Sequence, residues 1–307
     1  MTGGRHGALS AAFIVLILEL SLSSCATRPN SVRLATSWTE LGNAYAELGK
    51  WDKAGEAWAS ALALDPGQGI AGYNLVRSLT EAGSYVEAVA AADTVLARDP
   101  KNASTMAVKA YALHKAGRDT EALKVYERVV ELNGGDTVSR FNHAVLLEAA
   151  GRKAEALEEY LGLLGEKKDD TAASLRAGIV LGGLGRSEEA LPYLERYLET
   201  APDSVEGLRI LAVTREGVGL YMKAMEAWEK LLTKAPNDAT AWFRLARLRL
   251  SVAGDSKGGL DALRKAIEAG YSDATAAHAL LDTPAIVAAD DAAAILAPLL
   301  KETDPTQ

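Results

Sequence analysis

Apolar residues between positions 35 and 68 follow a helical spacing twice, with a glycine between the two runs. The first run is Trp38, Leu41 and Tyr45, three and four residues apart. The second run, after Gly49, keeps the same spacing and consists of Trp51, Ala54, Trp58 and Ala61. Residues spaced in this way lie on one face of an α-helix. The pattern predicts two amphipathic helices joined by a tight turn.

This two-helix unit recurs with a period of 34 residues. Steps of that length from Gly49 always meet glycine, at Gly83, Gly117, Gly151, Gly185 and Gly219. The same steps from Ala54 always meet alanine, at Ala88, Ala122, Ala156, Ala190 and Ala224. Glycine can adopt the left-handed conformation that ends a helix. Alanine lets two crossing helices approach to about 8–10 Å. We therefore expect helical hairpins beginning at residues 35, 69, 103, 137, 171 and 205.

The first unit resembles the tetratricopeptide repeat, a helix–turn–helix of 34 residues with a characteristic set of aromatic and small residues. The matching positions are Trp38, Leu41, Gly42, Tyr45, Gly49, Ala54, Ala61 and Pro66. The resemblance implies an all-α fold, an α-solenoid in which the hairpins stack into a right-handed superhelix. It also implies a scaffold that binds other proteins.

A seventh unit begins at residue 239 and then departs from the pattern. From Gly254 to Ala262 there are eight residues where the other units take five, which predicts a turn about three residues longer. From residue 273 the chain is rich in alanine, and Thr283-Pro284 predicts a break with a helix on either side. We expect residues 35–272 to form the solenoid and residues 273–307 a helical cap and tail.

The N-terminus has the pattern of a processed segment. Residues 1–24 contain a short polar start and an apolar stretch too short to span a bilayer as a helix. The end of this segment with Cys25, the only cysteine of the chain, resembles the lipobox of bacterial lipoproteins. The resemblance implies a signal peptide over 1–24, a lipid on Cys25 and a linker over 25–34. Ala26 implies the outer membrane, and the expected location is the bacterial cell envelope, facing the periplasm.

Charge and motifs narrow the possible functions. There are 33 Lys and Arg against 41 Asp and Glu, a net charge of −8, which argues against a nucleic-acid surface. No histidine pair has a metal-ligand spacing, and no phosphate-binding loop or nucleophile motif occurs in the sequence. We therefore expect no metal and no cofactor, and we predict that the protein is not an enzyme.

In the tetratricopeptide family the first helices line a concave groove, with the fifth and ninth residues of each unit facing into it. In this chain the fifth and ninth residues, together with some of their neighbours, predict a groove with an apolar and aromatic centre flanked by arginines. The expected partner-binding residues are Tyr73, Arg77, Tyr111, His114, Phe141, Val145, Leu175, Ile179, Arg209, Phe243, Arg244 and Arg247. One hypothesis is that this groove holds a partner segment with apolar anchors and acidic ends. The other is that half of the apolar residues fill the core and the arginines are solvated charges.

A clamp for a partner's C-terminal carboxylate is a known site of this family, and it can be checked position by position. Asn43 and Asn74 match its two asparagines. Its three cationic positions hold Thr39, Ser104 and Val108 instead. The sequence therefore predicts that this clamp is absent.

Two functions agree with these observations. The first is a membrane-anchored scaffold of the bacterial envelope that binds a partner protein or peptide in its concave groove. The alternative is a ligand-binding or accessory lipoprotein of a periplasmic transport system, in which the solenoid encloses a small molecule. A pocket closed by the terminal segment would favour the second function, and an open groove would favour the first.

Overall fold

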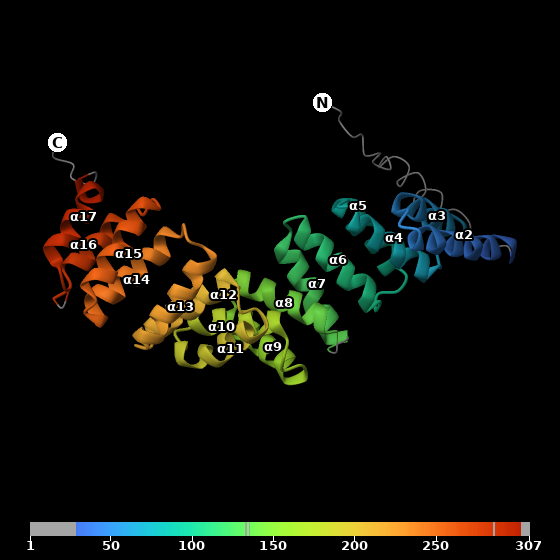
Figure 1. Cartoon of the computed structure of the whole chain (residues 1–307). Coiled ribbons are helices and arrows are strands. Elements are labelled where there is room, and N and C mark those ends of the chain that lie inside the picture. The colour runs from blue at the N-terminus through green and yellow to red at the C-terminus, as the bar shows by residue number, and fades with distance from the viewer. Residues whose placement is uncertain (1–28, 133, 135, 285, 302–307) are drawn as a thin grey trace, which may run out of the picture. The chain divides into compact units, whose positions relative to one another are not determined.

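The computed structural model describes residues 29–132, 134, 136–284 and 286–301. This part of the chain contains sixteen α-helices and one π-helix, and it contains no strand (Figure 1). The chain forms two compact units that meet in sequence at Gly151 and Arg152. The expected all-α fold of helical repeats is confirmed. Each unit is described by itself below.

Helices of similar length follow one another in each unit, and consecutive helices contact each other from α2 to α8 and from α9 to α15. The N-terminal unit contains α2 (Pro29–Glu47), α3 (Trp51–Leu64), α4 (Gly69–Glu81), α5 (Tyr85–Leu96), α6 (Ala103–Lys115), α7 (Asp119–Leu132) and α8 (Thr137–Ala149). The C-terminal unit contains α9 (Lys153–Glu166), α10 (Thr171–Gly183), α11 (Ser187–Thr200), α12 (Val205–Gly217), α13 (Tyr221–Lys234), α14 (Ala239–Leu248), the π-helix η1 (Arg249–Ala253), α15 (Ser256–Glu268), α16 (Ala274–Leu281) and α17 (Ala289–Lys301).

The glycine that recurs every 34 residues closes the first helix of each pair, as expected. Gly49 has φ 68°, and its five counterparts from Gly83 to Gly219 have φ between 75° and 79°. The residue after five of these six glycines donates its backbone N–H into the last turn, as Lys50 does to the carbonyl of Tyr45 at 2.9 Å. A side chain on Cβ would be strained in this conformation, so the turn requires glycine.

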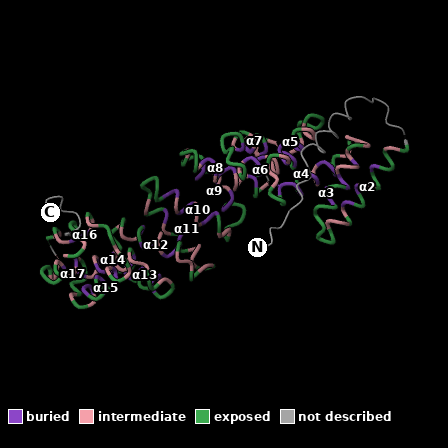
Figure 2. Tube along the Cα trace, turned by 90° about the horizontal axis from the view of Figure 1, so that it is seen from above, coloured by how far each residue is buried: buried purple, intermediate pink, exposed green. Residues whose placement is uncertain are grey.

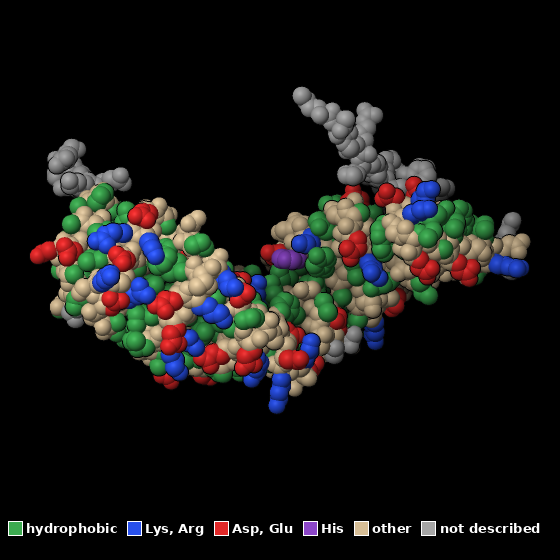
Figure 3. All heavy atoms as spheres, in the orientation of Figure 1, with side chains coloured by type: hydrophobic (Ala, Val, Ile, Leu, Met, Phe, Trp, Pro, Cys, Tyr) green, Lys and Arg blue, Asp and Glu red, His purple; other side chains and the backbone are tan. Residues whose placement is uncertain are grey.

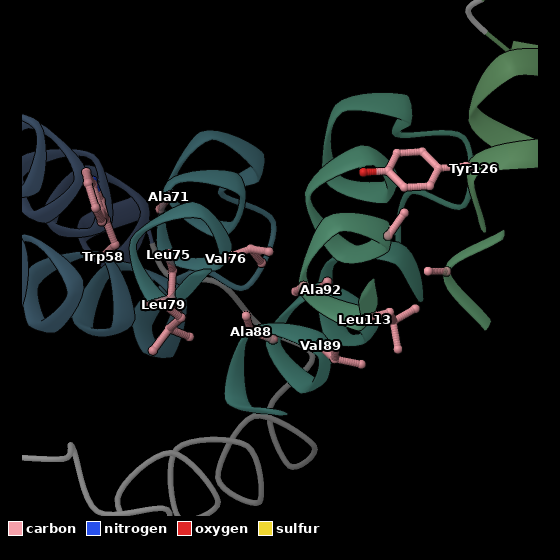
Figure 4. Packing of buried hydrophobic residues seen from close by; sticks show 14 of the residues in the cluster. Trp58, Ala71, Leu75, Val76, Leu79, Ala88, Val89, Ala92, Leu113 and Tyr126 are labelled. Atoms are coloured by element: carbon pink, nitrogen blue, oxygen red, sulfur yellow. The ribbon is translucent and has the colours of Figure 1, made fainter. Parts of the chain in front are cut away.

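The recurring alanines lie where the two helices of a pair cross. All six, from Ala54 to Ala224, are fully buried. Larger residues four positions further on complete the core, among them Trp58, Tyr126 and Trp228. Figure 4 shows this packing in the N-terminal unit, and Figure 2 shows that buried positions recur along the helices of both units. Regular small and large positions therefore produce a core that runs along each stack of helices.

The structure describes only part of the N-terminal segment for which the sequence made predictions. Helix α2 begins at Pro29, so residues 29–34, which we expected to be linker, are helical. The expected signal peptide and Cys25 lie outside the described residues. No helix in the described part of the chain is long and apolar enough to cross a membrane.

The longer turn that we expected in the seventh repeat is wrong. Gly254 has φ 67°, and α15 begins at Ser256, two residues later, as α13 begins two residues after Gly219. The repeat is longer by one residue, which lies in the π-helix η1 before the turn. Gly259 then takes the place of the recurring alanine. It is buried, and a Cβ there would lie 2.5 Å from Cγ of Leu250.

Two further helices follow the seventh repeat, on either side of the expected break. Both α15 and α16 contact α17. The apolar cluster of this end includes Leu280 of α16 and Leu296 of α17, together with Leu250 and Leu263. The segment between the two helices is fixed by a hydrogen bond from the backbone N–H of Val287 to the carbonyl of Leu250 at 3.0 Å. These helices thus cover the apolar end of the last repeat, as the prediction of a cap requires.

Candidate partner-binding site

In the N-terminal unit the expected binding residues lie on α4, α6 and α8 and are at least partly accessible. Tyr73 is half-buried and Arg77 is exposed, with its guanidinium 6.0 Å from the ring centroid of Trp51. Tyr111 is 39% exposed, and Phe141 and Val145 on α8 are half-buried. The first helices of this unit therefore present aromatic side chains rather than a closed apolar core.

His114 has a local partner. Its Nδ1 lies 2.7 Å from Oδ1 of Asp119, at the start of the next helix. Both side chains are well exposed, so the contact is a surface contact that contributes little to stability. Among the described residues no group of histidine, cysteine or acidic side chains could hold a metal ion.

The two asparagines that match the carboxylate clamp bond within the protein instead. Asn74 donates from Nδ2 to Oδ1 of Asn43 at 3.0 Å. The indole Nε1 of Trp58 donates to the same oxygen at 3.1 Å. The pair therefore joins α2, α3 and α4, and Oδ1 of Asn43 and Nδ2 of Asn74 are engaged in structural hydrogen bonds.

In the C-terminal unit the expected residues lie on α10, α12 and α14. Leu175 and Ile179 on α10 are half-buried. On α12, Val213 is 44% exposed and stands one helical turn after Arg209. Figure 3 shows Lys and Arg side chains gathered over the C-terminal helices, interspersed with acidic ones.

Phe243 is a correction to the expected binding residues. It is only 3% exposed and belongs to the apolar cluster that includes the cap. Its ring stacks on Tyr271 with the ring centroids 4.1 Å apart and the planes within 9°. The register of the repeat places Phe243 toward the groove. Tyr271, which follows α15 and lies close to the end of the regular repeats, covers it.

Two arginines of α14 converge on one carboxylate of α12. Arg244 donates from Nη1 to Oε2 of Glu216 at 3.3 Å, and Arg247 donates from Nη2 to the same oxygen. The other oxygen accepts from Nε1 of Trp228 at 2.6 Å. The Glu216 side chain is 7% exposed, whereas those of Arg244 and Arg247 are 42% and 34% exposed. One buried negative charge thus holds two accessible positive charges, and the cluster keeps a net positive charge.

Tyr271 lies beside this arginine cluster. Burial raises the pKa of its hydroxyl to about 12, and Asp273 acts in the same direction, while the positive charges of Arg244 and Arg247 act in the opposite direction. The hydroxyl therefore keeps its proton at neutral pH and can donate a hydrogen bond. Arg244, Arg247 and Tyr271 together offer donors suited to a carboxylate.

The third arginine of this unit is engaged with the start of α14. Arg209 donates from Nη2 to Oδ2 of Asp238, whose other oxygen accepts the backbone N–H of Ala241 at 2.9 Å and caps the helix. Burial works to raise the pKa of Asp238, but the bonds from Arg209 and Ala241 outweigh it and the pKa is lowered. Arg209 therefore forms a structural ion pair with Asp238, and 39% of the Arg209 side chain is still exposed.

Sequence reasoning did not find Glu216, Trp228 or Tyr271 as parts of this site. The sequence carries a signal for Glu216, since Arg244 and Arg247 follow it by 28 and 31 residues. Residues separated by slightly less than one 34-residue repeat lie on neighbouring first helices. An acidic residue at that offset from an arginine pair is therefore a detectable sign of such a cluster.

Helix pairs that recur with a period of 34 residues, each with a left-handed glycine between its two helices, define an α-solenoid of the kind that serves as a protein-interaction scaffold rather than as a catalytic fold. Profiles of the tetratricopeptide repeat match residues 39–103, 73–137 and 211–274, and also residues 172–204. These matches span more than half of the chain, so the protein belongs to the tetratricopeptide repeat family.

Solved structures agree with this assignment at the level of the fold. The C-terminal part of a TPR repeat-containing protein from Cytophaga hutchinsonii is 17% identical with TM-score 0.61, covering 76% of this chain and 96% of that chain. A tetratricopeptide repeat protein from Parabacteroides merdae is 17% identical with TM-score 0.55, covering 81% and 98%. YrrB, described as a TPR protein with an unusual peptide-binding site, is 19% identical with TM-score 0.56, covering 61% and 96%. No curated protein matches the chain.

Proposed function

We propose that the protein is a scaffold of the bacterial envelope, tethered to a membrane through a lipid on Cys25, that binds an acidic segment of a partner protein. The observation that carries the partner's chemistry is the cluster of Arg244 and Arg247 around the buried Glu216. Because one carboxylate serves two guanidinium groups, N–H donors remain for a second carboxylate from outside. YrrB, one of the structural relatives, is described as a peptide-binding protein, which agrees with a peptide ligand.

Apolar side chains on the same helices supply the second part of the recognition. Ile179 and Leu175 of α10 are half-buried, and Val213 of α12 is exposed. Each can gain buried area when a segment lies across α10, α12 and α14. A few residues supply most of the affinity of an interface, and arginine is among the residue types enriched there. The proposed ligand therefore has an apolar centre and a carboxylate near one end.

Peptide binding tests this proposal directly. The probe is a labelled peptide with leucine and phenylalanine at its centre and glutamates at its ends, and the control peptide has glutamines instead. We expect the glutamate peptide to bind about tenfold more tightly, because a charged hydrogen bond contributes roughly 1.5–3 kcal/mol. The preference should weaken as salt is raised. Equal binding of the two peptides would contradict the proposal.

Matched variants locate the site. Replacing Arg244 and Arg247 together by glutamine should remove the preference for glutamate. Arg264→Gln is the control, since Arg264 is an exposed arginine of α15 that pairs with Asp261. Ile179→Glu should abolish binding of both peptides while circular dichroism stays helical. If Arg264→Gln weakens binding as much as the double variant, the effect is one of general charge and the site is wrong.

The membrane tether is tested separately. Cys25→Ser should remove the mobility shift that acylation produces on a gel and should release the protein from the membrane fraction. Several acyl chains hold a protein on a bilayer stably, at about 0.8 kcal/mol for each buried CH₂. Unchanged membrane association of Cys25→Ser would refute the lipid anchor and leave the peptide site untouched.

A further inference from the structure

Helix α2, at the edge of the N-terminal unit, carries apolar side chains on two faces (Figure 1). On one face Ala35 and Thr39 are buried in the unit, with 0% and 7% of their surface exposed. On the other face Leu34, Leu41 and Leu48 are 50%, 39% and 67% exposed. The core of the unit explains the first face only, so the second face indicates a further contact.

The accessible leucines have the spacing of a helix that pairs with another helix. They are seven residues apart, and the small residues Ser37 and Ala44 stand between them and are exposed as well. Alternating steps of three and four residues form the seam of a coiled coil. Small residues in such a seam let the partner helix approach closely. We call Leu34, Ser37, Leu41, Ala44 and Leu48 the α2 stripe.

Comparison with later repeats shows what the α2 stripe lacks. Leu41 is the seventh residue of its repeat, and the leucines at that position in later repeats, Leu75, Leu211 and Leu245, are only 8%, 4% and 1% exposed. Leu75 packs against α3, the second helix of the preceding repeat, because its Cδ1 lies 3.9 Å from where a Cβ of Gly55 would stand. In the described part of the chain no helix precedes α2. Leu41 is therefore exposed because the place of a preceding helix is open.

The length of α2 adds to this open face. Helix α2 has 19 residues, whereas the corresponding helices α4, α6, α8, α10 and α12 each have 13. The additional turns come before the repeat and carry Val32, which is 38% exposed, and Leu34. From Leu34 to Leu48 the stripe is about 21 Å long, at 1.5 Å for each residue. A stripe of this length can contact a second helix over several turns.

The other end of the repeats cannot supply the missing helix. There α16 and α17 cover the last repeat, and Leu280 and Leu296 are 1% and 0% exposed. A head-to-tail contact, with α2 of one copy on the last repeat of the next, is therefore blocked by the cap. The α2 stripe of a second copy has the same open face. Pairing of identical surfaces about a twofold axis is the commonest arrangement of protein oligomers.

Charged residues along one edge of the α2 stripe favour one direction of such a pair. Arg33, Glu40 and Glu47 are also seven residues apart, each stands one position before a leucine, and all three are exposed. In an antiparallel pair centred on Leu41 equal edges meet, so Arg33 of each copy lies opposite Glu47 of the other. Only Glu40, near the axis, meets its own copy. A parallel pair would set this edge against the opposite edge of α2, whose residues carry no charge.

We propose that the α2 stripe is the interface of a homodimer, in which α2 of two copies pairs antiparallel about a twofold axis at Leu41. Leu34 of each copy packs against Leu48 of the other, and the two Leu41 side chains meet at the axis. The interface is one helix wide, so it lies at the small end of protein interfaces and the dimer is weak. This inference depends neither on the lipid anchor nor on the arginine cluster of α14.

Sedimentation equilibrium tests the proposal on the chain from residue 25 onward with Cys25→Ser, which keeps every described helix and needs no lipid. We expect a monomer–dimer equilibrium with a dissociation constant on the order of 10 µM. Leu41→Glu should weaken the dimer about a hundredfold, because two carboxylates would meet at the axis. Leu48→Glu, at a more exposed position, should weaken it as well.

Val86→Glu is the matched control, since Val86 is a 69% exposed apolar residue of α5. It should leave the dimer unchanged, and circular dichroism should stay helical in all three variants. A chain that remains monomeric at about 200 µM would overturn the proposal and leave the face to a helix of another protein. A dimer that both Leu41→Glu and Leu48→Glu leave intact would also overturn it.

Cysteine substitutions in the same background, which has no other cysteine, distinguish the two directions. Leu41→Cys should give a disulfide-linked dimer on mild oxidation, because a disulfide needs Cα atoms about 4.4–6.8 Å apart. Leu34→Cys alone should not, because its two copies are about 21 Å apart along antiparallel helices. Leu34→Cys combined with Leu48→Cys should crosslink. Efficient crosslinking of Leu34→Cys alone would indicate a parallel pair and refute the proposal.

Charge reversal tests the contact between Arg33 and Glu47. Arg33→Glu should weaken the dimer about fivefold, and the additional change Glu47→Arg should restore it, because the same pair forms in the opposite sense. Glu40→Gln should strengthen the dimer about twofold by removing the repulsion at the axis. If the double variant dimerises no better than Arg33→Glu, the antiparallel arrangement is wrong.

Discussion

The fifth and seventh repeats are built in the same way, but their fourth residues differ greatly in size. Both begin with an aspartate that caps the first helix, Asp170 and Asp238. Both close that helix with a left-handed glycine. In the fifth repeat the fourth residue is the small, fully buried Ser174, whereas in the seventh it is Trp242, which contacts two apolar clusters. The helix pair therefore forms with either a small or a large fourth residue, and this position is free to vary with function.

The seventh repeat differs again in its π-helix. The extra residue in η1 changes the hydrogen bonding of the last turn, and the carbonyl of Leu250 receives the backbone N–H of Val287 from the cap. The buried Gly259 allows Leu250 to approach α15. The fifth repeat has Ala190 at that position and continues into a further repeat. The irregular last turn of this helix is thus part of the contact between the seventh repeat and the cap that ends the stack of helices.

Exchanging the large and small residues should give the largest effect. Trp242→Ser should lower the free energy of unfolding by about 2–3 kcal/mol, because it removes a half-buried indole between two clusters. Ser174→Trp should lower that free energy as well, by about 1–3 kcal/mol, because Ser174 is fully buried and an indole there would overpack the fifth repeat. Amide hydrogen exchange measures each effect locally, which suits a protein whose repeats unfold in parts. Unchanged stability of Ser174→Trp would contradict close packing around Ser174.

The next comparison is between a helical glycine that packs closely against another residue, Gly259, and one that does not, Gly182. Gly259→Ala should lower the free energy of unfolding by about 1–3 kcal/mol, because its Cβ would collide with Leu250. Gly182→Ala in α10 should raise it by about 0.5–1 kcal/mol, because no atom lies within 4 Å of the new Cβ and alanine favours the helix. Chemical denaturation of the two variants beside the wild type checks the signs. The same sign for both would show that the approach of Leu250 does not exclude a Cβ at Gly259.

The sequence predicted what is strictly periodic and missed what breaks the period. Gly49 and Ala54 with their counterparts predicted each turn and crossing of the first six repeats, because each position admits almost one residue type. The π-helix was missed because a single inserted residue allows two alignments, one with Ala262 and one with Gly259 in the alanine position. Only the backbone conformation decides between them.

The candidate site could be predicted only where the residues that contact a side chain also belong to the regular repeats. Arg244 and Arg247 lie on α14 as expected, and the offset to Glu216 follows from the period. Phe243 was misplaced because Tyr271, which covers it, follows the last regular helix pair.

The smallest expected effect concerns the cap of the seventh repeat. Asp238→Asn keeps the cap, since asparagine accepts the same backbone bond, and loses the charge that pairs with Arg209. Because the pKa of Asp238 is lowered in the folded protein, its stabilisation is present above the ordinary value of 3.8. It is lost as pH falls through the lower folded value.

The wild type should therefore exceed Asp238→Asn by about 0.5–1 kcal/mol in free energy of unfolding at pH 7, and the difference should decrease as pH falls below 3.8. Urea denaturation at several pH values measures this difference. Asp170→Asn, the same exchange at the start of the fifth repeat, is the control, since it leaves the Arg209 pair in place. A difference for Asp238→Asn that persists unchanged at pH 2 would show that the cap, and not the charge, distinguishes the seventh repeat.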